Sequence, residues 1–129
     1  MKGLGFVWVM LAFAVVVLAA GIPYWRIPYD ELNRGHFAVL PGALLLGFLT
    51  FILIVTKVAP AKSIALAMLA CVPVIVCISI AKDTARDPTS HNLWPFELII
   101  AAIAGAAVIV PVMLLALALR WALARMAAR

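Results

Sequence analysis

Four long apolar runs dominate this 129-residue chain and constrain its fold more than any other feature. Each run holds about 18 to 22 residues, and a helix that rises about 1.5 Å per residue then crosses the roughly 30 Å of bilayer hydrocarbon. The runs show no alternation of polar and apolar residues, which argues against transmembrane β-strands. Because lipid offers no hydrogen-bond partner to the backbone, we expect helices over about residues 3–22, 37–58, 62–81 and 95–120.

The scarcity of charge supports this assignment. Only 12% of the residues are charged and 68% are hydrophobic, whereas roughly a quarter of the residues in a soluble domain are charged. This composition excludes a soluble globular domain, a disordered chain and a nucleic-acid-binding module, despite the net charge of +5. We therefore expect an all-α integral membrane protein, a four-helix transmembrane bundle that forms a single domain over residues 1–129.

The charged residues predict an orientation. Six bases lie at the N-terminus, between the second and third runs, and in the tail at 120–129: Lys2, Lys57, Lys62, Arg120, Arg125 and Arg129. The other four bases and all five acids lie in or beside the loops at 23–36 and 82–94: Arg26, Arg34, Lys82, Arg86, Asp30, Glu31, Asp83, Asp87 and Glu97. Cytoplasmic loops carry the excess of bases. We expect both termini in the cytoplasm, both loops outside, and residence in a bacterial inner membrane.

The first apolar run has a second interpretation. The segment Val17–Leu18–Ala19 could end a secretory signal that is removed by cleavage. The run is longer than the roughly 7–15 apolar residues usual for such a signal. We favour a retained helix and leave cleavage open.

The four runs also suggest a weak parallel repeat of two hairpins. Each hairpin would be a helix, an outer loop and a second helix. Each loop begins with a base, Arg26 or Lys82, and ends with a histidine beside an aromatic helix entry, at His36 or His91.

Most of the polar variety in the chain lies around the second outer loop. The candidate residues for an outer-interface polar site are Asp83, Arg86, Asp87, His91, Asn92, Glu97 and His36. The simpler interpretation is a helix entry, because Pro95 suits a first helical turn and Glu97 would lie near the positive end of the helix dipole. The alternative is a small site in which Glu97, partly removed from water, carries a proton or a cation.

These residues do not match a known metal motif. Two histidines with Asp83, Asp87 or Glu97 would be plausible ligands, but no pair has the close spacing of such a motif. We expect no metal, no cofactor and no catalytic residue. The two cysteines, Cys71 and Cys77, are six apart on one run and are expected to be packing residues.

Aromatic and basic residues predict contacts with the bilayer. Trp25, Trp94 and Trp121 are expected to anchor the helices at the interfaces. Arg120, Arg125 and Arg129 are expected to continue the last helix and to contact anionic phospholipid headgroups at the cytoplasmic face. Two interior prolines, Pro73 and Pro111, predict kinks.

Three functions are compatible with these features. No ionisable residue lies near the middle of any apolar run, which disfavours a proton or ion path. We favour a non-enzymatic accessory, scaffold or immunity-type component that packs against a membrane partner or forms a homo-oligomer. The alternatives are a small oligomeric transporter or lipid flippase that uses Glu97 and the second outer loop, and a membrane enzyme that uses His91, Asp87 and Glu97.

Overall fold

The computed structural model describes residues 3–28, 36–89 and 93–129, and the side chains of 36–38 are outside the description. The described residues form helices and no strands: α1 Gly3–Arg26, α2 His36–Val55, α3 Ala61–Leu69, α4 Cys71–Thr84 and α5 Trp94–Ala127. Three helical spans are long and apolar enough to cross a membrane, namely Gly3–Arg26, Ala61–Thr84 and Trp94–Ala127. The expected all-α class is therefore confirmed for the described residues, and three of the four expected spans are long enough to cross a membrane, whereas the apolar part of α2, Val39–Val55, is shorter.

The first helix is longer than expected. The prediction ended it near residue 22, before Pro23, but α1 continues through Pro23 to Arg26. A proline inside a helix removes one backbone hydrogen bond and usually bends the helix. The additional turn carries Trp25, whose contacts with α4 are described below.

The third predicted helix is divided in two. Residue Ala70 separates α3 from α4 with φ −67° and ψ −16°, and its N–H donates to carbonyls of α3. Pro73 follows three residues later and cannot donate to the carbonyl of Leu69. Gly105 of α5 lies against this place, since a Cβ at Gly105 would be 3.4 Å from the Leu69 oxygen. The absence of a side chain at Gly105 thus lets α5 approach this turn closely.

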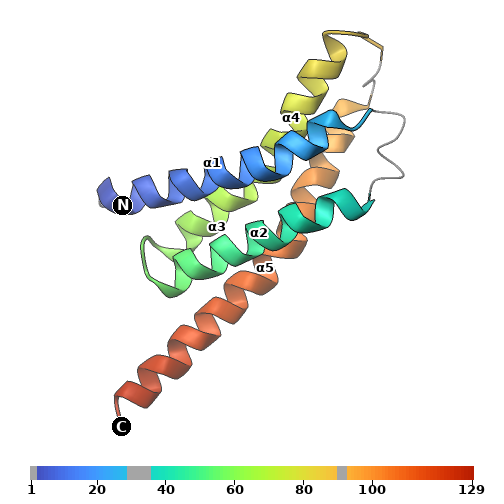
Figure 1. Ribbon diagram of the computed structural model, residues 1–129. Helices are drawn as coiled ribbons and strands as arrows, with labels where there is room; N and C mark the ends of the chain where they lie inside the picture. Colours follow the sequence, from blue (N-terminus) through green and yellow to red (C-terminus); the bar gives the residue numbers. More distant parts are fainter. Residues whose placement is uncertain (1–2, 29–35, 90–92) are drawn as a thin grey trace.

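The helices surround one apolar core (Figure 1). The first half of α5 packs against α2 and α4, and α1 lies across α2 and α4 on the other side. The most deeply buried apolar side chains are Val9, Val16, Ile54, Ile64, Met68 and Cys71. Burial of Cys71 agrees with its expected packing role, whereas Cys77 is exposed.

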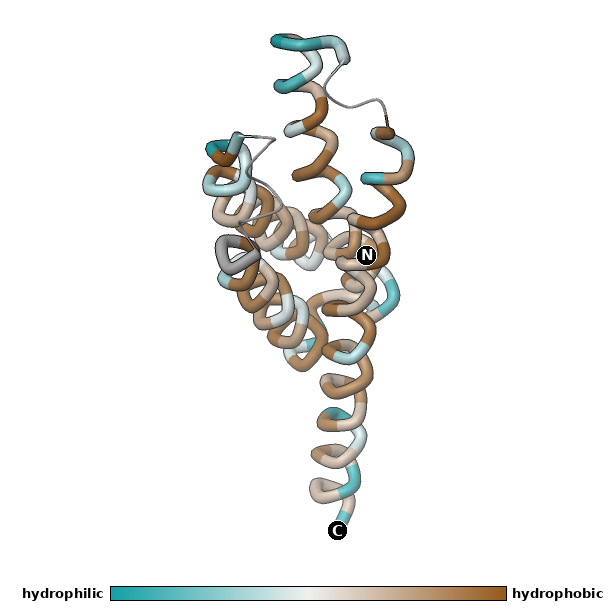
Figure 2. Tube along the Cα trace, turned by 90° about the vertical axis from the view of Figure 1, so that its right-hand side faces the viewer, coloured by the Kyte–Doolittle hydropathy of each residue, from teal (hydrophilic) through white to brown (hydrophobic). Residues whose placement is uncertain are grey.

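The C-terminal half of α5 separates from the other helices only toward its end, because Ala116 is fully buried and Arg120 contacts α2. Both views show the end of α5 extending beyond the other helices, and Figure 2 shows hydrophilic residues toward that end (Figures 1 and 2). α5 is one helix of 34 residues and continues through Pro111. Large apolar side chains are exposed all along this half, among them Leu114, Leu115, Trp121, Leu123 and Met126.

Candidate functional site

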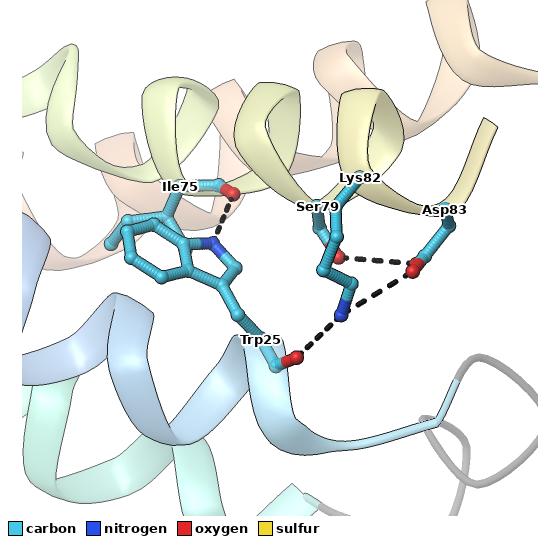
Figure 3. A network of polar contacts seen from close by, with 5 residues as sticks. All are labelled: Trp25, Ile75, Ser79, Lys82 and Asp83. Atoms are coloured by element: carbon cyan, nitrogen blue, oxygen red, sulfur yellow. Dashed lines mark hydrogen bonds and ion pairs between the residues drawn. The ribbon is translucent and has the colours of Figure 1, made fainter. Parts of the chain in front are cut away.

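The most connected group of polar residues lies where the ends of α1 and α4 meet (Figure 3). Helical periodicity places Ile75, Ser79, Lys82 and Asp83 on one face of α4, and that face points toward Trp25 at the end of α1. We call these five residues the α1–α4 cluster.

Trp25 joins the two helices through a hydrogen bond to the backbone. Its indole Nε1 donates to the carbonyl oxygen of Ile75 over 2.9 Å. The indole lies back over Gly21, because a Cβ at Gly21 would be 2.6 Å from the ring. Trp25 is therefore partly buried between helices, whereas Trp94 and Trp121 expose more than half of their surface.

Lys82 links the cluster to the end of α1. Its ammonium donates to the carbonyl oxygen of Trp25, in the last turn of α1, where carbonyls lack partners within the helix. A cation at this position also interacts favourably with the negative end of the helix dipole. Lys82 therefore caps α1 from a position 57 residues further along the chain.

Asp83 completes the cluster. Its Oδ1 lies 3.3 Å from the Lys82 ammonium, and its Oδ2 accepts a hydrogen bond of 3.5 Å from the Ser79 hydroxyl. The side chain of Asp83 is 14% exposed and that of Lys82 is 31% exposed. The carboxylate thus balances a half-buried cation.

The other described residues of the predicted polar site do not join this cluster. Asp87 accepts hydrogen bonds from the backbone N–H of Thr89 at 3.0 Å and from its hydroxyl at 2.7 Å. Both hydrogen bonds lower the pKa of Asp87 from its ordinary value, and the bond from the backbone N–H has the larger effect. Arg86 is exposed, and Glu97 lies partly buried in the first turn of α5.

The histidines of the predicted site lie outside the described part of the chain. His91 and Asn92 are not described, and only the backbone of His36 is, at the start of α2. The predicted grouping of His91 with Asp87 and Glu97 therefore stays a prediction. Among the described residues, no group of three His, Cys, Asp or Glu side chains could hold a metal ion.

A second basic cap lies at the opposite end of the molecule. The Arg120 guanidinium on α5 donates to the carbonyl oxygen of Ile54, in the last turn of α2, over 3.4 Å. The same oxygen accepts the backbone N–H of Lys57 at 3.2 Å, and the N–H of Val58 donates to Leu53 at 3.4 Å. This is the hydrogen-bond pattern of a Schellman motif, with Lys57 in the left-handed conformation at φ 57°.

The other bases of the tail make different contacts. Arg125 stacks over the indole of Trp121, 3.6 Å from the ring centroid, in a cation–π interaction. Arg129 is exposed at the end of the chain. The three arginines therefore divide into one that caps a helix and two that remain at the surface of the tail.

Sequence reasoning missed the capping roles of Lys82 and Arg120. Their position near predicted helix ends is the available signal, because carbonyls at helix C-termini attract cations. Each cap joins two helices, α1 to α4 through Lys82 and α2 to α5 through Arg120. The chain matches no protein-family model, no curated protein and no solved structure.

Proposed function

We propose that the chain is a non-enzymatic, multi-pass protein of a bacterial inner membrane. Its helices would form a four-helix bundle with both termini in the cytoplasm. It would act as an accessory, scaffold or immunity-type component by packing α5 against the helix of a partner membrane protein. The observation that carries the proposal is the end of α5 beyond Arg120, which projects past the other helices with the side chains of Trp121, Leu123 and Met126 exposed.

The length of α5 supports a protein partner. Its 34 residues span about 51 Å, against roughly 30 Å of hydrocarbon. If Trp94 marks the outer interface, α5 leaves the hydrocarbon near Leu114 when upright and near Arg120 at a tilt of about 40°. Lipid tails therefore do not cover the exposed Trp121 and Met126 at any usual tilt.

The face of α5 that points away from the other helices has suitable chemistry. The inward face carries the buried Ile109 and Ala116 and the capping Arg120. Helical periodicity places Ala107, Leu114, Ala118, Trp121 and Arg125 on the opposite, outward face, and each of them is exposed. Small residues such as Ala118 allow close approach of a second helix, and Trp and Arg are favoured at binding interfaces.

Site-specific photocrosslinking in native membranes tests this proposal. A photoreactive residue at Leu114 should form an adduct of one discrete mass with a partner protein, which mass spectrometry then identifies. The same residue at Leu18 of α1 is the matched control, because Leu18 is 54% exposed and Leu114 is 59% exposed. Leu18 should react with lipid alone.

Two results would contradict the proposal. One is an adduct at Leu114 that contains only lipid. The other is an adduct at twice the mass of this chain, which would make α5 the seam of a homo-oligomer instead.

A further inference from the structure

An apolar cavity of about 190 Å³ lies among α1, α2, α4 and α5. Its walls include the buried side chains of Val16, Leu46 and Ile75, one from each of the first three of these helices, and Ala104 of α5. The lining residues extend from about the middle of the spans Gly3–Arg26, His36–Val55 and Ala61–Thr84 toward the ends that lead to the loops at 23–36 and 82–94. The cavity therefore lies at the depth of one leaflet.

The exposed residues of the lining locate its opening. Val39 at the start of α2 and Ala104 of α5 are exposed, whereas the other lining residues are buried or partly buried. The cavity thus opens between α2 and α5, toward whatever surrounds the helices. The span Trp94–Ala127 is apolar enough to cross a membrane, and in the membrane location proposed above that surrounding is lipid.

Water is a poor occupant of this cavity. A water molecule in a buried site needs two to four polar partners, and an apolar cavity of about 150 Å³ stays dry and binds apolar ligands. An empty cavity is also unfavourable, because its lining atoms lose dispersion contacts. The walls therefore favour a hydrocarbon occupant.

We propose that the cavity binds one acyl chain of a membrane phospholipid. The lining extends about 12 Å along α1, from Val16 to Tyr24, and about 10 Å along α2, from Val39 to Leu46. This elongated shape suits an unbranched chain better than a compact ring. Ile75 belongs both to the cavity wall and to the α1–α4 cluster, whose Ser79 and Lys82 follow on the same face of α4 toward its C-terminal end. The headgroup would remain outside, near that polar level.

Lipid retention by the full chain tests the proposal. The protein is incorporated into bilayers of phosphatidylethanolamine and phosphatidylglycerol, extracted in detergent and analysed by native mass spectrometry. The wild type should retain one phospholipid per chain. Ala104→Leu fills the cavity and should reduce the retained fraction at least tenfold. Ala107→Leu is the control, because Ala107 lies on the same helix, is exposed and does not line the cavity.

A second variant protects the test against a folding defect. Ala43→Leu fills the cavity from α2 and should reduce retention in the same way. Equal retention by the wild type and both cavity variants would overturn the proposal, as would equal loss in Ala107→Leu. Neither result bears on the partner contact at α5, which the crosslink at Leu114 reports separately.

Discussion

At the scale of single residues, two positions set the path of the chain between α2 and α3. Gly5 of α1 packs on the connection, because a Cβ at Gly5 would overlap the carbonyl oxygen of Val58. Lys57 turns the chain out of α2 in the left-handed conformation, which costs a residue with a side chain about 1–2 kcal/mol. At both positions, the local backbone geometry determines which substitutions preserve stability.

The first residue-scale prediction concerns Gly5. Gly5→Ala should lower the free energy of unfolding by about 1–3 kcal/mol, because the added methyl must displace the backbone of the neighbouring connection. Gly3→Ala is the control, since nothing lies within 4 Å of a Cβ at Gly3. Thermal unfolding in detergent measures both. Equal stability of the two variants would contradict the close contact between Gly5 and Val58.

The second residue-scale prediction concerns Lys57. Lys57→Gly should raise the free energy of unfolding by about 1 kcal/mol, because glycine adopts positive φ without strain. Lys62→Gly removes the same charge from the first turn of α3 and should lower stability by up to about 1 kcal/mol. Opposite shifts of the melting temperature are expected. A loss of stability in both variants would argue against the left-handed turn.

At the scale of helical elements, the sequence predicts which segments form helices but not the residues at which these helices end. Runs of about 20 apolar residues predict helices because lipid leaves the backbone no other partner. The extension of α1 past Pro23 depends on contacts of Trp25 with α4, about 50 residues away in the sequence. Likewise, the sequence identifies the polar residues around the second outer loop as a group. It does not predict that Asp83 pairs with Ser79 whereas Asp87 pairs with Thr89.

The caps at the helix ends give the first element-scale prediction. Lys82→Met should lower the free energy of unfolding by about 1–2 kcal/mol, because the C-terminal carbonyls of α1 and the carboxylate of Asp83 lose their cation. Arg86→Met removes an exposed base just after the end of α4 and should change stability little. Chemical unfolding in mixed micelles compares the two. An equal change in the free energy of unfolding for both variants would contradict the capping role of Lys82.

The loop after α4 gives a prediction about pH. The bonds from Thr89 keep the pKa of Asp87 below 3.8. A lowered pKa in the folded state means that this contribution to stability is present above the unfolded pKa. It is lost as the pH falls through the folded pKa. Thr89→Val removes the hydroxyl donor and keeps the backbone one, so the pKa of Asp87 should rise partway toward 3.8. Carboxyl chemical shifts in an NMR titration measure this change, and an unaltered titration would contradict it.

At the scale of the whole molecule, charge and apolar surface have separate roles. Lys82 and Arg120 cap helices at opposite ends, while the interior between them is mostly apolar and contains the cavity of about 190 Å³. The end of α5 that projects from the body carries exposed apolar side chains, as do the outer faces of α1 and α2. This arrangement is why we assign the function to packing against another membrane protein.

The most direct test of this claim measures, in liposomes, how strongly this chain associates with the partner protein that the crosslink at Leu114 identifies. The partner and this chain carry a donor and an acceptor fluorophore, and energy transfer is measured against dilution in lipid. Ala118→Trp, on the outward face of α5, should weaken association at least tenfold. Ala14→Trp, at an exposed position of α1, should leave association unchanged. Equal association of both variants with the partner would contradict the assignment of α5 as the binding surface.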